Sequence, residues 1–308
     1  MGAAAALASR HHSAVAFDLD DEASYRRWRA AKLAAYPRRV DELVVDIVDP
    51  LALTSTERDA LLDRLARANI AVYRQRSGPL DAAGVRRLGG QLGLRRLDAH
   101  WLAGEDGVSR ITVSDRSDGR GGFIPYTDRP IRWHTDGYYH PAGQRIRAMI
   151  LHCARPAAEG GANALLDHEI AYLLLRDASK DHVRALMAED AMTIPERCDD
   201  DGVARAAQTG PVFSVDPHDG ALHMRYTART RSIAWKDDAA TRAAVAALQG
   251  ILATAPQVLR LRLDAGMGIV AHNVLHDRSG FRDDPTRPRL VYRARYLDRT
   301  AVPGVGRG

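Results

Sequence analysis

The chain has few cysteines and no long apolar run. Only two cysteines, Cys153 and Cys198, occur in 308 residues, and neither belongs to a CxxC or comparable spacing. A disulfide framework and a cysteine-based zinc module are therefore disfavoured, and a reducing cytoplasm is the expected location. No apolar run approaches the length needed to cross a membrane, and the apolar start at residues 1–8 lacks the basic segment of a secretory signal. We expect no membrane partner.

The excess of positive charge is small and scattered. Lys and Arg number 44 against 39 Asp and Glu, so the formal net charge is +5 and the isoelectric point is near 9.4. The arginines form neither a basic tail nor a stripe with interleaved aromatic residues, which is the pattern that single-stranded nucleic acid prefers. We therefore expect a small-molecule substrate and no nucleic-acid partner.

Length and composition favour one large globular domain. Hydrophobic residues make up 45% and charged residues 27% of the chain, which is ordinary for a folded protein, and no internal repeat is visible. Residues 1–40 carry no recognisable chemistry and are expected to be a lead-in segment. Residues 41–308 are expected to form the single domain.

Hydrophobic periodicity predicts strands in the middle and at the end of the chain, with helices inserted between them. Helices are expected at 54–68 (capped at Thr54), 81–90 (capped at Asp81), 168–176, 183–188 and 239–253, and strands at 43–48, 70–73, 110–113, 131–136, 148–153, 164–166, 259–263, 268–273 and 290–297. This order predicts a mainly β, α+β protein built on an antiparallel barrel or sandwich.

One short stretch, Trp133-His134-Thr135-Asp136-Gly137, has metal-ligand spacing. Side chains two residues apart on a strand point to the same face, so His134 and Asp136 can share one metal ion. A second histidine would complete a two-histidine, one-carboxylate triad, the arrangement that holds ferrous iron with open positions. His272 and His276 both lie in a suitable run and are the two candidates for this position.

These residues resemble the taurine dioxygenase and gamma-butyrobetaine hydroxylase group (TauD/TfdA type) of Fe(II)- and 2-oxoglutarate-dependent oxygenases. The resemblance covers residues 124–295. It is carried by Tyr126-Thr127, His134-Thr135-Asp136, Gly160-Gly161 ahead of Asn163, Gly210-Pro211-Val212, Leu275-His276, Arg289 and Arg293. It implies a double-stranded β-helix (jelly-roll) core.

The resemblance also implies roles for individual residues. His134, Asp136 and His276 would hold Fe(II), and Arg289 would bind the far carboxylate of 2-oxoglutarate through paired hydrogen bonds. Asn163 stands where relatives often carry threonine and would donate to the same cosubstrate. Two departures accompany this match, because that asparagine replaces threonine and Asp277 replaces the glycine that follows the second histidine in relatives.

Alternation places four arginines on one face of the last expected strand. By amphipathic logic alone, Arg287, Arg289, Arg293 and Arg295 would face water. The resemblance reverses this expectation for Arg289 and for Arg293, which would contact the cosubstrate or an anionic substrate. Arg287 and Arg295 are expected to be surface or salt-bridged residues.

Two tyrosines follow the expected metal ligands directly. Tyr138 and Tyr139 could line the substrate pocket, where aromatic faces would suit a quaternary ammonium group, or they could simply pack in the core. Arg293 would instead favour an anionic substrate. The histidines at 140, 152 and 168 lack ligand spacing and are expected to be structural.

The resemblance implies oxidative decarboxylation of 2-oxoglutarate to succinate and CO2, coupled to hydroxylation of a small, charged organic substrate. The cofactors would be Fe(II), with 2-oxoglutarate and O2 as cosubstrates. Two other classes stay open at this point: a non-catalytic barrel that binds a small anion or metal, and a divalent-metal hydrolase with the same triad. A homo-oligomer is possible.

Overall fold

The fold was analysed in a computed structural model, which describes residues 16–77, 79–98, 103–114, 120–199, 202–229, 231 and 233–300. The backbone divides into two compact units. Unit 1 comprises residues 1–35, 133–145 and 166–258, and unit 2 comprises residues 36–132, 146–165 and 259–308. The expected lead-in at 1–40 is described from residue 16 onward, and residues 1–15 lie outside the described part.

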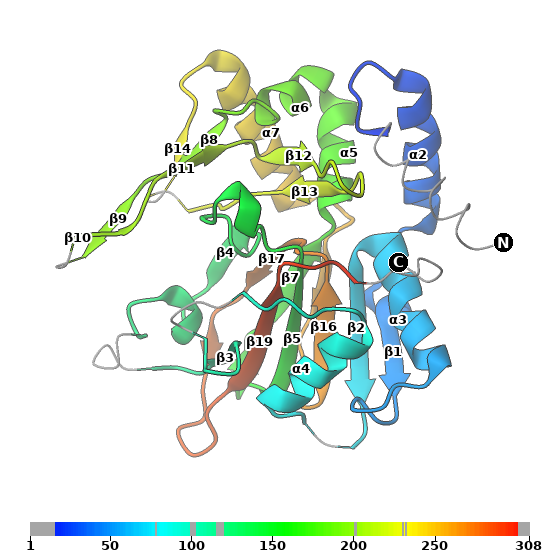
Figure 1. Ribbon diagram of the computed structural model, residues 1–308, viewed down its shortest axis with the longest axis vertical. Coiled ribbons are helices and arrows are strands. Elements are labelled where there is room, and N and C mark those ends of the chain that lie inside the picture. Colours follow the sequence, from blue (N-terminus) through cyan, green and yellow to red (C-terminus); the bar gives the residue numbers. More distant parts are fainter. Residues whose placement is uncertain are drawn as a thin grey trace. The chain divides into compact units, whose positions relative to one another are not determined.

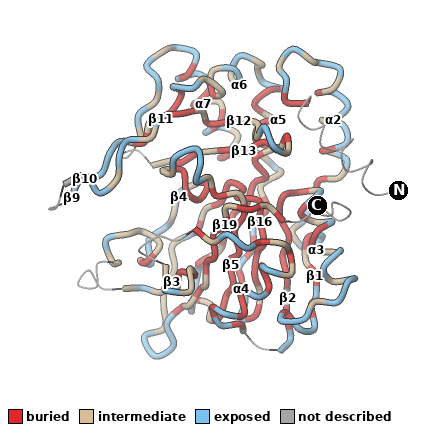
Figure 2. Tube along the Cα trace, in the orientation of Figure 1, coloured by how far each residue is buried: buried red, intermediate tan, exposed pale blue. Residues whose placement is uncertain are grey.

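Unit 2 is built on a six-stranded sheet with the order β1-β2-β16-β5-β19-β3 (Figure 1). Its strands are β1 (Val44–Ile47), β2 (Ile70–Gln75), β16 (Met267–Ala271), β5 (Ala148–Arg155), β19 (Leu290–Tyr296) and β3 (Val108–Ile111). Only the β1–β2 pair is parallel, and the other four pairs are antiparallel. Figure 2 shows that β5, β16 and β19, which are central in this order, are largely buried.

Two helices, α3 (Ser55–Ala68) and α4 (Ala82–Gln91), cover one face of this sheet. Both begin where the sequence predicts. The Thr54 hydroxyl accepts a hydrogen bond from the Glu57 N–H at 3.2 Å, and the Glu57 carboxylate accepts one from the Thr54 N–H at 2.8 Å. Asp81 caps α4 by accepting from the Gly84 N–H at 2.7 Å. These caps fix where each leucine-bearing helix face meets the sheet.

A second sheet of four strands has the order β15-β7-β17-β4. Its members are β15 (Leu259–Leu261), β7 (Asn163–Leu166), β17 (Leu275–Arg278) and β4 (Ile131–His134). A separate two-stranded sheet pairs β6 (Glu159–Gly160) with β18 (Phe281–Arg282). Short 3-10 helices occur at Val40–Leu43 and Ile124–Tyr126. The sequence predicts most of these strands, but it does not predict β17.

Unit 1 contains four α-helices and three small antiparallel sheets among its described residues. The helices are α2 (Glu22–Ala35), α5 (His168–Ala178), α6 (Lys180–Leu186) and α7 (Ala239–Thr254), with a 3-10 turn at Ala142–Gln144. The strands are β8 (Met192–Ile194), β9 (Arg197–Asp199), β10 (Gly202–Arg205), β11 (Gln208–Gly210), β12 (Phe213–Val215), β13 (Leu222–Met224) and β14 (Ala234–Trp235). The three helices from α5 onward confirm the periodicity, whereas the strands between residues 192 and 235 were not predicted.

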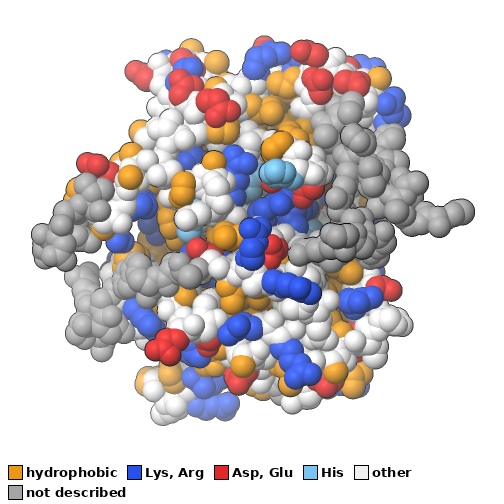
Figure 3. Space-filling model, in the orientation of Figure 1, with side chains coloured by type: hydrophobic (Ala, Val, Ile, Leu, Met, Phe, Trp, Pro, Cys, Tyr) orange, Lys and Arg blue, Asp and Glu red, His pale blue; other side chains and the backbone are white. Residues whose placement is uncertain are grey.

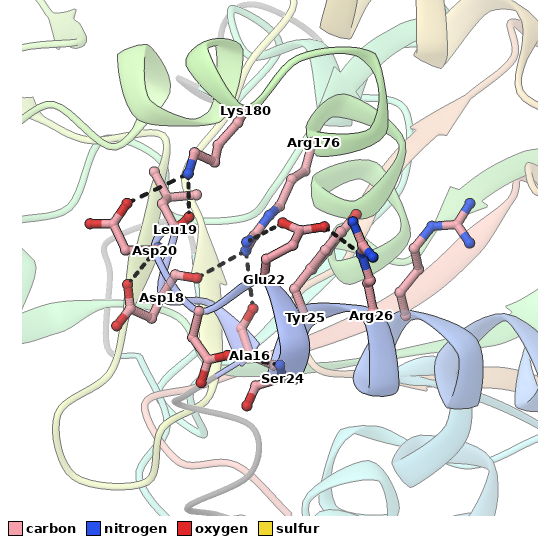
Figure 4. A network of polar contacts seen from close by, with 12 residues as sticks. Ala16, Asp18, Leu19, Asp20, Glu22, Ser24, Tyr25, Arg26, Arg176 and Lys180 are labelled. Carbon is pink, nitrogen blue, oxygen red and sulfur yellow. Dashed lines mark hydrogen bonds and ion pairs between the residues drawn. The ribbon is translucent and has the colours of Figure 1, made fainter.

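The described part of the expected lead-in packs on α5 through a polar network (Figure 4). The Arg176 guanidinium donates to the carbonyls of Ala16 and Asp18, both at 3.2 Å, and lies 3.8 Å from the centre of the Tyr25 ring. The buried Lys32 amine pairs with two carboxylates near the start of α5, including that of Asp167, at 2.6 Å each. Because each buried charge is matched here, α2 is an integral part of unit 1.

The observed fold class is a mixed, sheet-rich α/β protein with six α-helices among the described residues. No helix in the described ranges combines the length and hydropathy needed to span a bilayer. Both cysteines are free thiols. On the face seen in Figure 3, Lys and Arg side chains are interspersed with Asp and Glu, in keeping with the scattered charge of the sequence.

His152 on β5 is a structural histidine, as expected. Its ring is fully buried, with Nδ1 2.9 Å from the Tyr73 hydroxyl and Nε2 accepting from the Leu80 N–H at 2.9 Å. The ring is therefore neutral and protonated on Nδ1. Burial lowers the pKa of His152 from 6.5 to about 4.

This histidine should make the protein less stable in acid. Between pH 6.5 and pH 4 the unfolded chain gains a proton at His152 that the folded chain does not, so the free energy of unfolding should fall by about 3 kcal/mol across this range. Urea unfolding of His152→Gln, measured at several pH values, should show a flatter dependence. The exposed His218→Gln should keep the wild-type slope, and an unchanged slope in His152→Gln would contradict the assignment.

Candidate metal and cosubstrate site

His134 is held at the end of β4 by pairing with a later segment of unit 1. The Thr135 N–H donates to the Tyr226 carbonyl at 3.0 Å, and the Tyr226 N–H donates to the Thr135 hydroxyl at 3.1 Å. A β-bridge places His134 opposite Thr227. Thr135 is fully buried, so both its backbone and its side chain fix the strand on which the histidine lies.

Asp136 lies in a turn and not on a strand, which corrects the expectation of an extended strand over 131–136. The strand ends at His134 and the next residues turn, with Gly137 at φ +66° and the His140 N–H donating to its carbonyl at 2.8 Å. A positive φ is accessible to glycine without steric cost, so Gly137 allows the chain to turn directly after the carboxylate.

The second histidine, His276, is buried on β17 and is oriented by its own backbone. Its Nδ1 lies 3.0 Å from the Val274 carbonyl. A carbonyl only accepts hydrogen bonds, so Nδ1 carries a proton, and in the neutral ring Nε2 presents the lone pair. This is the tautomer that a metal-binding imidazole requires, with its other nitrogen fixed by a backbone acceptor.

The structure brings the three expected ligands together. His134, Asp136 and His276 each offer one ligand atom, and these atoms all lie within 4.8 Å of one another. Among the described residues this is the group of histidine, cysteine and acidic side chains that fits a metal ion. Two imidazoles and one carboxylate are the ligand set of non-heme Fe(II) sites in which some coordination positions stay open.

His272, the rival ligand, is used by the fold. Its Nδ1 lies 2.9 Å from Asn69 Oδ1, and its Nε2 lies 2.8 Å from the Thr300 hydroxyl. Because both ring nitrogens are engaged, His272 has no lone pair to offer a metal. His168 is structural as well, with its Nε2 3.0 Å from the Leu222 carbonyl.

Arg289 is a buried cation whose guanidinium forms no ion pair with a carboxylate within the described part of the chain. Its side chain is 7% exposed, and its guanidinium forms no ion pair and donates no hydrogen bond there. The guanidinium carbon of Arg289 lies 5.1 Å from the centre of the Phe281 ring. The chain at Gly161 is also close, since a Cβ added there would lie 3.8 Å from Arg289 Nε. Burial lowers the pKa of Arg289, although the nearby Cys153 and Asp283 oppose this effect. Such a guanidinium fits an incoming carboxylate.

Arg278, two residues beyond His276, has a role that the sequence did not reveal. Its guanidinium donates to the carbonyls of Pro125, Thr127 and Arg129 and lies 4.8 Å from the centre of the Phe281 ring. Burial, together with the neighbouring positive charge of Arg289, lowers the pKa of Arg278 to about 9. The arginine two residues beyond this candidate ligand therefore anchors the segment that leads into β4.

The two departures from the family pattern contact each other. Asn163 Nδ2 donates to the Asp277 carbonyl at 2.9 Å, and the Asp277 carboxylate accepts from the Ala164 N–H at 2.9 Å. One of the two amide hydrogens of Asn163 is thus committed to β17. The expected hydrogen bond from Asn163 to a cosubstrate would use its other amide hydrogen.

The arginines of β19 correct the amphipathic expectation. Arg293 and Arg295 are both buried, on a strand that lies between β5 and β3 in the sheet. Arg295 forms an ion pair with the buried Asp98, which agrees with its expected salt bridge, and Arg287 is exposed as expected. Alternation alone cannot identify a buried face that carries arginine.

Comparison with known proteins agrees with this geometry. The family model described as "Taurine catabolism dioxygenase TauD, TfdA family" matches residues 31–295. The chain belongs to this family. A curated relative from Streptomyces sp, a uridine-5′-phosphate dioxygenase, is 31% identical over 203 residues, which cover 63% of this chain and 71% of the relative.

Several solved structures share the fold. An asparagine oxygenase in complex with Fe(II), hydroxyasparagine and succinate has a TM-score of 0.58 at 16% identity, over 96% of this chain and 92% of its own. The non-heme iron oxygenase OrfP with Fe and alpha-ketoglutaric acid has a TM-score of 0.57 at 20% identity, over 79% and 80%. A putative taurine dioxygenase from Burkholderia xenovorans has 0.57 at 17%, over 84% and 88%.

Family membership and the site together establish the reaction class. The protein is an Fe(II)- and 2-oxoglutarate-dependent dioxygenase that couples oxidative decarboxylation of 2-oxoglutarate to hydroxylation of a small substrate. The alternatives of a non-catalytic binding barrel and of a hydrolase are thereby set aside.

The two histidines of one short run should behave differently when replaced. His276→Ala should weaken Mn(II) binding by more than about 100-fold, because even outer-shell partners of a metal cost about 10- to 100-fold. His272→Ala should bind Mn(II) normally but melt at lower temperature, because it loses hydrogen bonds to Asn69 and Thr300. Equilibrium dialysis and thermal melts test both, and the reverse pattern would refute the ligand assignment.

Proposed function

We propose that this dioxygenase hydroxylates a small phosphorylated substrate of the nucleoside 5′-monophosphate class, with His134, Asp136 and His276 as the iron ligands. The observation that carries the ligand assignment is the convergence of these three side chains within 4.8 Å. When bound, the iron supplies open positions for 2-oxoglutarate and O2 and the oxidative chemistry that follows. One oxygen atom enters succinate and the other enters the hydroxylated product.

The chain's own residues position these reactants. The Nδ1–H of His276 is held by the Val274 carbonyl, which keeps Nε2 available as a ligand. We propose that Arg289 binds the far carboxylate of 2-oxoglutarate with two parallel hydrogen bonds, since its buried guanidinium has no other anion to pair with in the described residues. Asn163 would add a donor, and Arg293 would contact the cosubstrate or the substrate.

The substrate class rests on the curated relative and on the charge around the tyrosines. That relative acts on uridine 5′-phosphate by name. In this chain Tyr139 already has the guanidinium of Arg205 over its ring, 5.5 Å from the centre. A cation over this ring opposes the binding of a quaternary ammonium group and favours an anion. Tyr138 and Tyr139 would then line the pocket of an anionic substrate.

The finer architecture is also part of the proposal. We assign the two sheets of unit 2 to a double-stranded β-helix (jelly-roll) core, which the antiparallel pairing of most strands supports. A single catalytic domain over 41–308 is supported by the unbroken family match over 31–295. Two free cysteines favour a reducing cytoplasm. Assembly as a homo-oligomer is kept as a hypothesis for size-exclusion analysis.

Removing the proposed carboxylate anchor should act on the cosubstrate. Arg289→Ala should raise the apparent KM for 2-oxoglutarate by about 30-fold or more, since losing one partner of a buried charge pair costs about 2 kcal/mol or more. Steady-state succinate assays measure this change. The exposed Arg287→Ala is the matched control and should keep the wild-type KM. An unchanged KM in Arg289→Ala would show that another residue binds the cosubstrate.

A substrate panel tests the proposed class. With Fe(II) and 2-oxoglutarate in air, uridine 5′-phosphate should raise succinate release at least about 10-fold above the substrate-free rate, whereas uridine, taurine and asparagine should not. His134→Ala should abolish the stimulated release. Stimulation by taurine or asparagine, but not by the phosphorylated compound, would overturn the substrate class while leaving the reaction class intact.

A further inference from the structure

One aromatic ring in unit 2 is shared by two buried arginines. The guanidinium carbon of Arg278 lies 4.8 Å from the centre of the Phe281 ring, and that of Arg289 lies 5.1 Å from it. Arg278 is 4% exposed and Arg289 is 7% exposed, so both cations are largely withdrawn from water. A ring attracts a cation within about 6 Å of its centre, and the attraction grows as water is removed. Phe281 therefore helps to hold both charges.

The two guanidinium groups differ in what else holds them. That of Arg278 donates to three backbone carbonyls in the segment before β4, which fix it in place. That of Arg289 donates no hydrogen bond to a described residue and forms no ion pair with a described carboxylate. The main chain of Arg289 is anchored, because its N–H donates to the Asp283 carboxylate at 2.7 Å. At the far end of this side chain, the Phe281 ring is the contact that can fix the guanidinium.

Phe281 is itself held by two different segments. Its N–H donates to the Asp128 carbonyl at 3.0 Å, in the segment before β4. Phe281 also pairs with Gly160 of β6, and the Gly161 N–H donates to the Gly280 carbonyl at 3.1 Å. The ring therefore projects from a backbone that hydrogen bonds fix in place.

The glycine pair Gly160-Gly161, part of the resemblance to the oxygenase family, permits this packing. Both residues have positive φ, at +73° and +71°, which glycine adopts without steric cost. A Cβ added at Gly160 would collide with the Gly280 carbonyl oxygen. A Cβ added at Gly161 would lie 3.6 Å from the Phe281 Cβ and 3.8 Å from Arg289 Nε. The two glycines thus let the chain lie directly against the ring and the guanidinium.

We propose that Phe281 is a positioning residue for 2-oxoglutarate, because its ring holds the Arg289 guanidinium where the far carboxylate of the cosubstrate binds. The inference rests on the proposed role of Arg289 as the carboxylate anchor. A phenyl ring attracts the cation without occupying its N–H donors. These donors stay available for two parallel hydrogen bonds, whereas an acidic partner would compete with the cosubstrate for them.

Fixing the guanidinium in advance also favours binding through entropy. An arginine side chain has many rotamers, and ordering it at the moment of binding would weaken the affinity. With the ring in place, this ordering has already occurred when the chain folds. Phe281 should therefore affect the affinity for 2-oxoglutarate and leave the affinity for the metal unchanged.

Binding of 2-oxoglutarate in the absence of oxygen tests the proposal separately from turnover. The full chain, loaded with Mn(II), is titrated with 2-oxoglutarate in a calorimeter. Phe281→Leu should weaken this binding by about 5- to 30-fold, the range expected for a partly desolvated cation–π contact. Phe281→Tyr keeps the aromatic face and should stay within about 3-fold of wild type. The affinity for Mn(II) should be unchanged in both variants.

A double-mutant cycle tests whether the ring acts through the guanidinium. In an Arg289→Ala background, Phe281→Leu should have no further effect on the affinity for 2-oxoglutarate. The matched control is Phe213→Leu, because Phe213 is a fully buried ring of unit 1 that meets Tyr172 with centroids 5.6 Å apart. This control should lower the melting temperature and leave the affinity for 2-oxoglutarate unchanged.

A ring-fluorinated phenylalanine in place of Phe281 keeps the shape of the ring but weakens its negative face. It should weaken 2-oxoglutarate binding as well, and it decides the question if circular dichroism shows that Phe281→Leu does not fold. Wild-type affinity in both altered proteins would overturn the inference. An undiminished effect of Phe281→Leu in the Arg289→Ala background would overturn it too.

Failure of the proposed anchor would look different. Arg289→Ala would then bind 2-oxoglutarate like wild type, and the anchor and this inference would both be wrong. If Arg289→Ala loses affinity while Phe281→Leu and the fluorinated protein do not, the anchor stands and only the role of Phe281 is wrong.

Discussion

Removing a guanidinium from water is costly, and this cost organises much of the molecule. Arg278 is buried and donates to three carbonyls, and Arg225 does the same with the carbonyls of Gln208, Met192 and Gly210. Arg176 has two carbonyls and a tyrosine face, and Arg295 has a buried aspartate. Each of these arginines connects chain segments that are distant in sequence. Arg289 is buried in the same way without such a partner, which is why it stands out as a binding residue.

Histidines divide by the same criterion. His152 and His272 have both ring nitrogens in hydrogen bonds with the surrounding protein. These bonds offset the cost of burying the two rings, so both histidines contribute to stability. The Nδ1 of His276 lies against a backbone carbonyl, and a ligand atom of its ring belongs to the group it forms with His134 and Asp136. The difference lies in the contacts of the rings, because all three histidines are buried.

Local chemistry explains what could be predicted from the sequence. Thr54 and Asp81 cap helices through contacts three residues away, so their signatures are readable without a fold. The grouping of His134, Asp136 and His276 was predicted from spacing and family resemblance. The faces of β19 were not, because burial of Arg293 and Arg295 depends on strands that precede it by more than 140 residues. Arg205 escaped notice for the same reason, since only tertiary structure brings it over the Tyr139 ring.

The contacts between β7 and β17 bear on how the protein handles its metal. Asp277 and Asn163 bond each other's strands through a side chain in each direction, so β17 cannot slide by one residue without losing both bonds. Register is thereby set by the protein itself and not by the ion. His276 is accordingly held in place by the protein alone, so the free energy of metal binding need not offset the entropy lost in ordering this strand.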